Sequence, residues 1–183
     1  MTRIPLVTRE GATPEQLRVG DQIFTKHGEG FQGPSAALLQ VPDIAELFDD
    51  LRDRVSRNSG LQGATLQLAS LVAARYWSND FVFNVRVRLA KRAGIDAEII
   101  EAIRHRWKPK IADPELAATY TFATELLSKD GPSEAAHNAL KAFIGDEGMV
   151  EITMVVGTYC MLCLVSRAIG LETQEAGIPP LEK

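Results

Sequence analysis

The sequence is short of the residues on which several classes of protein depend. It has 2 cysteines in 183 residues, too few for the disulfide framework of a small secreted scaffold. Its three histidines, His27, His105 and His137, lie in separate segments, and none is paired with a serine and an acid for a catalytic triad. His-x-x-x-His, phosphate-loop and dinucleotide glycine patterns are also lacking. We therefore expect no metal site and no nucleotide, haem or flavin cofactor.

Long apolar runs and basic blocks are lacking too. The longest nearly uninterrupted apolar run, 152–165, is shorter than the about 20 residues that cross a bilayer, and Glu151 and Arg167 bracket it. The first residues lack the apolar stretch and cleavage site of a signal peptide. The net charge of −4 and the scattered basic residues give no reason to expect nucleic acid. We expect a cytoplasmic protein with neither membrane nor nucleic acid as partner.

What is present indicates one all-helical domain over residues 1–183. A hydrophobic share of 45% with 24% charged residues is ordinary for a globular fold of this length. Helix-start signals recur along the chain, beginning with a capping box at Thr13 to Gln16 that has Pro14 at the first helical position. Apolar residues recur at helical spacing after Pro42, over 64–77, after Asp96, after Asp113 and from Pro132 onward, with expected stops at Gly145 and Gly170. We expect seven to nine helices, with 1–12 and 172–183 as extended arms, the second of which could lie on a neighbouring subunit.

One segment is ambiguous from the sequence. Residues 81–89 alternate like a half-buried strand and are rich in β-branched residues. No partner strand with a hairpin turn lies nearby, and Gly94 follows as a helix stop. We therefore expect a helix here.

Several short segments together resemble the carboxymuconolactone decarboxylase and alkylhydroperoxidase family. They are 5–7, Gly33-Pro34 with Leu38-Leu39 and Pro42, Ala73-Ala-Arg-Tyr-Trp77, Leu89-Ala-x-x-Ala-Gly94-Ile, Glu101-Ala-Ile103 and Gly157-x-Tyr159. The resemblance lies in their order and spacing over most of the chain. It implies an all-helical bundle of the alkylhydroperoxidase-like type that works as a homo-oligomer, often a trimer or hexamer, with pockets near the subunit contacts.

The residues of the family's peroxidase site are replaced here. Peroxidase members carry a glutamate, a Cys-x-x-Cys pair and a histidine, and the matching positions hold Gln67, Asn79, Val82 and Arg86. Peroxide reduction of that kind needs a thiolate, a resolving thiol and a proton relay, which these four side chains cannot supply. The sequence therefore predicts that this site has lost the peroxidase mechanism.

The resemblance to the decarboxylase members leaves another activity open. Those members lack the paired thiols and have a histidine at the Arg86 position, which can donate a proton to the carbanion left by loss of carbon dioxide. Arginine stays charged and donates poorly, but its two parallel N–H groups suit a carboxylate. We therefore expect a lyase or isomerase of aromatic-compound catabolism that acts on a small cyclic acid or lactone, with Gln67, Asn79 and Arg86 lining its pocket.

The roles of the supporting residues, and two rival functions, stay open at this point. Arg75, Asp80 and Tyr159 are secondary candidates for binding the substrate, and no residue is assigned as the proton donor. Arg86 could equally belong to a solvated basic face with its basic neighbours on the same stretch. A protein that keeps only the fold, for binding or assembly, is one rival. A second is a peroxidase that uses Cys160 and Cys163, although their apolar flanks favour inert core thiols.

Overall fold

The chain is described by a computed structural model over residues 2–28, 30–171 and 180–182. Its helices are α1 (Pro14–His27), α2 (Gly33–Leu38), α3 (Pro42–Ser56), α4 (Gly63–Tyr76), α5 (Asp80–Arg92), α6 (Ala97–Arg104), α7 (Pro114–Leu126) and α8 (Glu134–Ile169). The described residues contain no strand. The expected all-helical fold is therefore confirmed, and residues 81–89 are helical, within α5.

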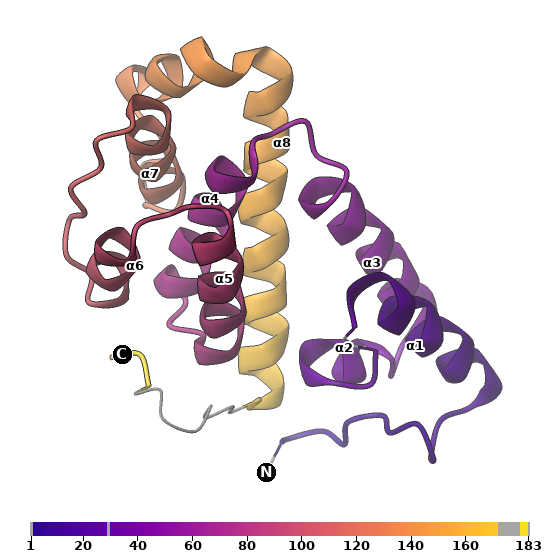
Figure 1. Cartoon of the computed structure of the whole chain (residues 1–183). Helices are drawn as coiled ribbons and strands as arrows, with labels where there is room; N and C mark the ends of the chain where they lie inside the picture. Colours follow the sequence, from indigo (N-terminus) through magenta and orange to yellow (C-terminus); the bar gives the residue numbers. More distant parts are fainter. Residues whose placement is uncertain (1, 29, 172–179, 183) are drawn as a thin grey trace.

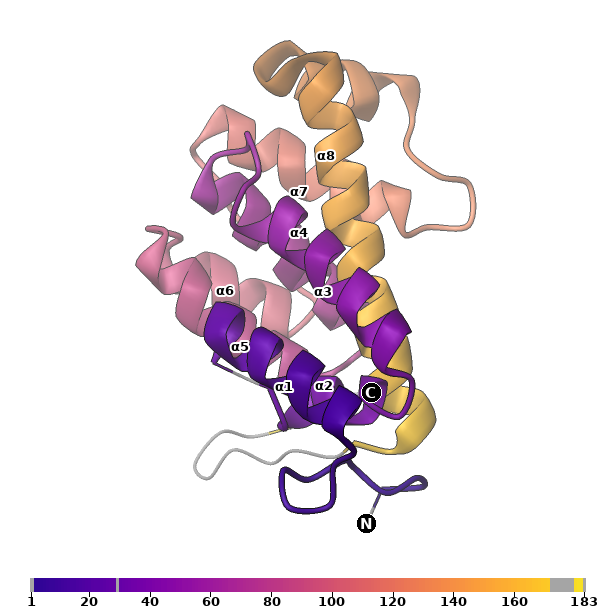
Figure 2. The same ribbon diagram turned by 90° about the vertical axis from the view of Figure 1, so that its right-hand side faces the viewer.

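Helix α8 runs along the length of the molecule and separates two groups of helices (Figures 1 and 2). Helices α4 to α7 pack together on one side of it, and α1 to α3 lie on the other. The main hydrophobic core joins α4, α5, α6, α7 and α8, while a smaller core around Val19, Ile23 and Leu39 holds the first helices together. α4 packs against α5, α7 and α8, so it is the centre of the bundle.

The expectation of an amphipathic helix over 64–77 is wrong in one respect. In α4 the residues from Leu68 to Arg75 are all buried, so this helix has no solvent face along most of its length. A helix enclosed by others is apolar on every side, and small residues such as Ala69, Ser70 and Ala73 let its neighbours approach closely. Leu68, Leu71 and Val72 contribute to the core as expected, but they are not one face of a surface helix.

Side-chain capping explains where four of the described helices begin: α1, α5, α7 and α8. Thr13 and Gln16 form the predicted capping box of α1, and Asp113 accepts a hydrogen bond from the Leu116 amide at the start of α7. At α6, Asp96 lies at the expected cap position, but its side chain makes no capping hydrogen bond. The cap of α5, Asn79, is described with the functional site.

Gly145 interrupts α8 as the sequence predicts, and the helix is kinked at this residue. Its φ of 67° and ψ of −176° lie outside the helical range and in a region that favours glycine. By length and composition alone α8 could cross a membrane, but 56% of its most apolar window is buried inside the chain. The core helix of a soluble protein has the same composition, so this helix does not distinguish the two settings.

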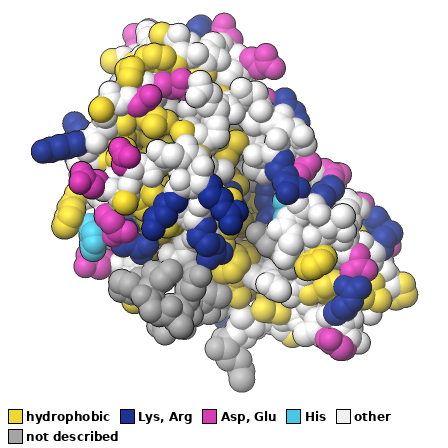
Figure 3. Space-filling model, viewed as in Figure 1, with side chains coloured by type: hydrophobic (Ala, Val, Ile, Leu, Met, Phe, Trp, Pro, Cys, Tyr) yellow, Lys and Arg dark blue, Asp and Glu magenta, His cyan; other side chains and the backbone are white. Residues whose placement is uncertain are grey.

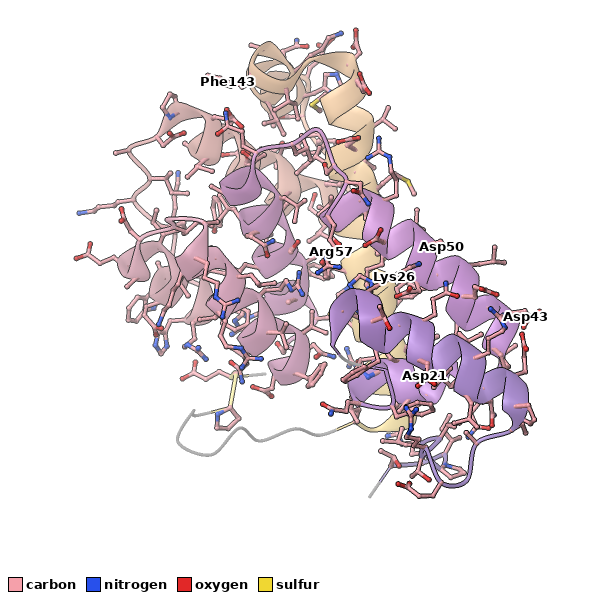
Figure 4. The ribbon with its side chains drawn as sticks, turned by 45° about the vertical axis from the view of Figure 1, so that its right-hand side comes forward. Asp21, Lys26, Asp43, Asp50, Arg57 and Phe143 are labelled. Atoms are coloured by element: carbon pink, nitrogen blue, oxygen red, sulfur yellow. The ribbon has the colours of Figure 1, made fainter. Side chains whose placement is uncertain are left out.

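A cluster of charged side chains joins α1 to α3. Lys26 donates to Asp50 at 2.6 Å, and the two lie close together where α1 faces α3 (Figure 4). Beside them the nearly inaccessible Asp49 lies 3.0 Å from Nε2 of His27. Burial raises the pKa of Asp49, but the His27 contact, with Arg52 and Lys26, outweighs it and holds this pKa below its usual value. His27 therefore has a structural partner.

The C-terminal arm can be followed only at its end, because 172–179 lie outside the described residues. Leu181 is buried in the main core of its own chain, and its amide donates to Asp80 at 2.6 Å. The end of the arm thus contacts its own bundle, and the expectation that the arm lies on a neighbouring subunit stays a prediction. The N-terminal arm is free of helix from residue 2 to residue 13, as expected.

Candidate functional site

The predicted site lies on a helical hairpin made by α4 and α5. The two helices are joined by a short turn and run antiparallel, since a Cβ placed on Gly63 at the start of α4 would lie 3.9 Å from the Cβ of Ala93 beyond the end of α5. Gln67 and Arg86 are nearly equidistant from the turn, so they lie within about one helical turn of each other along the hairpin. Helix α8 packs against both arms and supplies the third side.

Arg86 makes the most specific polar contact of the site. Its Nη1 donates to the hydroxyl of Tyr159 on α8 at 2.6 Å, and its guanidinium carbon lies 4.7 Å from the centre of the Tyr159 ring. Tyr159 is 1% exposed and lies in the core, while Arg86 is partly buried beside it. Because the tyrosine oxygen accepts this hydrogen bond, its own proton is directed to another acceptor. The pair thus combines a fixed cation with a hydroxyl that can donate.

Asn79 connects the start of α5 to the same helix. Its side-chain oxygen accepts from the Val82 amide at 2.9 Å and so caps α5, while its amide nitrogen donates to the Cys163 carbonyl at 3.4 Å. Both ends of this amide are engaged within the protein. Asn79 therefore fixes the position of α5 against α8, and it brings Cys163 beside the N-terminus of α5.

A scan against models of known protein families finds no match, and a search of the curated proteins finds none either. The arrangement of helices, however, is shared with solved structures. An alkylhydroperoxidase AhpD core protein from Ralstonia eutropha JMP134, described as an uncharacterized peroxidase-related protein, superposes with a TM-score of 0.74 at 16% identity, covering 95% of this chain and 93% of that chain. A variant of the debrominase Bmp8 in complex with 2,3,4-tribromopyrrole superposes with a TM-score of 0.75 at 14% identity, covering 96% and 93% of the two chains. The chain has an AhpD-like fold. At these identities the likeness shows the fold alone.

Within this AhpD-like fold the backbone carbonyl of Cys163 on α8 lies against Asn79 at the start of α5. A helix N-terminus lowers the pKa of a nearby thiol, but burial acts in the opposite direction. Cys163 is inaccessible to solvent, and burial followed by the neighbouring Cys160 strongly raises the pKa of its thiol. Burial also raises the pKa of Cys160, with the Trp77 indole N–H acting against it. Both thiols are therefore protonated at neutral pH.

We expect Cys160 and Cys163 to be unreactive in the native protein. Replacing both with alanine is expected to lower the free energy of unfolding by about 1–3 kcal/mol through lost packing, without changing any activity. Denaturant unfolding measures the first effect, and a thiol reagent at neutral pH should label the native protein far more slowly than the unfolded protein. Rapid native labelling, or peroxide consumption that the double substitution abolishes, would overturn this assignment.

Three helices of the AhpD-like bundle also carry buried polar atoms that lack a hydrogen-bond partner within the described chain. These atoms are Oε1 of Gln67 on α4, Oδ1 of Asn84 and Nε of Arg86 on α5, and Oγ1 of Thr158 on α8. Buried polar atoms are normally satisfied, so each unpaired one calls for an explanation. Thr158 was missed by sequence reasoning, and its surroundings in an apolar helix give no signal for it.

The other predicted residues lie apart from this group. Arg75 is turned toward α6, where its Nε donates to the Arg104 carbonyl at 2.6 Å. Asp80 accepts from the Leu181 amide, which accounts for one of its carboxylate oxygens. The structure therefore joins Arg86 to Tyr159, ties Asn79 to α8 at the Cys163 carbonyl, leaves Gln67 on the adjacent arm, and turns Arg75 toward α6.

Two of the cavities among the described residues are not lined by Gln67, Asn79 or Arg86. One of about 200 Å³ lies between α4, α6 and α7, and one of about 300 Å³ lies near the bend of α8 beside Glu115, Glu147 and Glu151. Within the described ranges no three His, Cys, Asp or Glu residues are grouped so as to hold a metal ion. The chemistry available at the hairpin is therefore that of a guanidinium, a phenol and an amide.

Proposed function

We propose that the protein is a lyase or isomerase that acts without a cofactor on a small cyclic carboxylic acid or lactone. The observation that carries this proposal is the hydrogen bond between the partly buried Arg86 and the buried Tyr159, because it joins an anion-binding group to a proton-donating one. The AhpD-like fold alone fits several activities and does not decide among them. The small acidic substrate is inferred from the positive charge of Arg86.

In the proposed site Arg86 anchors a carboxylate of the substrate. Its Nε has no partner in the described chain, so it can donate to a carboxylate oxygen while Nη1 keeps its bond to Tyr159. Oε1 of Gln67 is available to accept a hydrogen bond from a hydroxyl of the substrate. Asn79 acts as a positioning residue, because both ends of its amide are engaged.

Tyr159 supplies the proton in this proposal. When the carbon–carbon bond to a carboxylate group of the substrate breaks, carbon dioxide leaves and the electron pair remains on carbon as a dienolate, which must be protonated. The Tyr159 hydroxyl gives its proton to that carbon, and the resulting phenolate is stabilised by the hydrogen bond from Arg86. Water then returns the proton to Tyr159.

A panel of small acids tests the proposal directly. One-ring lactone acids and cyclic carboxylic acids are titrated by calorimetry, and each is then incubated with the protein while products are followed by NMR. We expect at least one acid to bind and be converted, and its uncharged amide to do neither. Binding without conversion would instead support a binding protein of the same fold, a rival favoured by the position of both cavities away from Arg86.

Self-association is part of the proposal and is supported by an exposed apolar stripe on α8. Val150, Met154, Met161 and Leu164 recur on one side of this helix and are 67%, 40%, 48% and 45% exposed. We expect an oligomer, a trimer or hexamer, with a mass in multiples of 20.0 kDa. Light scattering measures it, and replacing Met154 and Met161 with lysine should yield a folded monomer.

The matched control is Leu47→Lys, which changes an exposed apolar residue of α3 that is 72% accessible. It should leave the mass unchanged if the α8 stripe forms the contact. A monomeric native protein would refute the expected assembly.

A further inference from the structure

The smaller of the two cavities is lined by charged and aromatic side chains as well as by apolar ones. It holds about 200 Å³, and its lining comes from α4, α6, α7 and the turns that follow them: Val72, Arg75, Tyr76, Ile103, Arg106, Tyr120, Thr124 and Leu127. Apolar side chains, two tyrosines and two arginines therefore surround one space, and no carboxylate lines it. The volume is below the range of about 300–1,000 Å³ typical of drug-sized ligands, so it suits a smaller molecule.

Arg75 is buried in the wall of this cavity, at 4% exposure. Its Nε donates to the Arg104 carbonyl at 2.6 Å and its Nη1 to the Ser78 hydroxyl at 2.8 Å. These bonds are to uncharged oxygens, and within the described ranges no carboxylate lies at ion-pair distance from this guanidinium. A buried charge is costly unless it is paired.

Arg106 brings a second guanidinium to the same oxygen. Its Nη2 donates to Oγ of Ser78 at 3.0 Å, so one hydroxyl links the two arginines. Like charges held close together repel, and burial followed by Arg106 lowers the pKa of the Arg75 guanidinium. Glu182 and Asp80 act on Arg75 in the opposite direction from a greater distance, whereas Arg104 adds to the positive charge. The wall of the cavity thus carries an excess of positive charge.

The backbone is strained at the two residues that hold this arrangement. Ser78 has a φ of 47° and Arg106 a φ of 58°, and among the described non-glycine residues only these two have a positive φ. Such conformations are costly and gather at ligand-binding positions. Here the strain turns the Ser78 hydroxyl and the Arg106 side chain toward each other at the cavity.

We propose that this cavity binds a small organic anion, a one-ring carboxylic acid whose carboxylate lies against Arg75 and Arg106. The ring lies among Val72, Ile103 and Leu127, with Tyr76 and Tyr120 as flat walls. Fork-shaped guanidinium groups bind planar carboxylates through paired hydrogen bonds. This site shares no lining residue with the Arg86–Tyr159 pair, and the inference does not rest on the proposed lyase activity.

Calorimetric titration with benzoate tests the site, with benzamide as the uncharged analogue and inorganic phosphate as an anion without a ring. We expect benzoate to bind the native protein at least about tenfold more tightly than either of the others. Arg106 is exposed, so the Arg106→Gln variant should fold normally, and its affinity for benzoate should be about tenfold lower. Thr124→Phe, which narrows the cavity and removes no charge, should weaken it as well.

Two controls locate the binding. Arg57→Gln removes an exposed charge at the C-cap of α3, a helix on the other side of α8, and should leave benzoate affinity unchanged (Figure 1). If Arg86→Ala abolishes benzoate binding while Arg106→Gln does not, the binding belongs to the other site and this proposal is wrong. The absence of benzoate binding, or equal binding of benzamide, would overturn it too.

Discussion

Replacing Arg86 with alanine is expected to lower the affinity for the substrate acid by about 10- to 100-fold. The change removes charge-assisted hydrogen bonds worth about 1.5–3 kcal/mol, and each 1.4 kcal/mol is about tenfold in affinity. It also leaves the buried hydroxyl of Tyr159 without its donor. Calorimetry on the best acid of the panel measures the loss.

Two companion variants separate the roles within the pair. Tyr159→Phe keeps the ring but removes the hydroxyl, so binding should largely persist while conversion stops. Arg92→Ala removes an exposed charge from the same helix, over which Lys and Arg side chains gather in Figure 3, and it should change neither quantity. If Arg92→Ala lowered the affinity for the acid as much as Arg86→Ala does, the general positive charge of the helix would attract the acid. The assignment of Arg86 as the anchor would then be wrong.

Replacing Glu151 with alanine is expected to have the largest effect on stability. This buried carboxylate of α8 accepts from Ser59 at 2.7 Å, from the Gly60 amide at 2.8 Å and from Arg54 at 2.7 Å. These bonds fasten α3 and the connection after it to α8. Hydrogen bonds to a charged group contribute about 1.5–3 kcal/mol, so the free energy of unfolding should fall by about 2–3 kcal/mol.

The same carboxylate predicts a dependence on pH. The Ser59 hydrogen bond, with those from Arg54 and Gly60, outweighs burial and lowers the pKa of Glu151. A folded-state pKa below the unfolded value stabilises the protein above the unfolded pKa, about 4.3, and this contribution is lost as the pH falls toward the folded value. The difference in the free energy of unfolding between the native protein and the Glu151→Ala variant should therefore become smaller below about pH 4.3.

Urea unfolding across pH 3–7 measures both effects. Glu147→Ala is the matched control, because it removes an exposed carboxylate from the same helix. Its stability should stay within about 0.5 kcal/mol of the native value. A Glu151→Ala protein as stable as this control at neutral pH would contradict the tethering role.

Much of the fold could be predicted from the sequence because its signals are local. The capping box at Thr13 and Gln16 and the break at Gly145 each act within a few residues, and the structure shows both in place. Residues 81–89 form a helix despite their β-like composition, because Asn79 caps this helix and the preceding turn folds it back on α4. The central position of α4 was not predicted, since enclosure depends on helices far away in the sequence.

The candidate site was predictable only in part. Arg86 and Tyr159 were both named from the sequence, but their contact joins residues 73 positions apart and needed the fold. Arg75 was named as a secondary candidate for the same site, whereas its place on α4 turns it toward α6. Nothing local marks Ser78 and Arg106 for a positive φ, because their strain is imposed by the surrounding helices.

One measurement tests the proposed anchor most directly: a crystal structure of the protein soaked with the tightest acid of the panel. We expect a carboxylate oxygen within hydrogen-bond distance of Nε of Arg86, with the bond between Arg86 and Tyr159 retained. An acid found only between Arg75 and Arg106, with the Arg86–Tyr159 pair untouched, would contradict the proposed function.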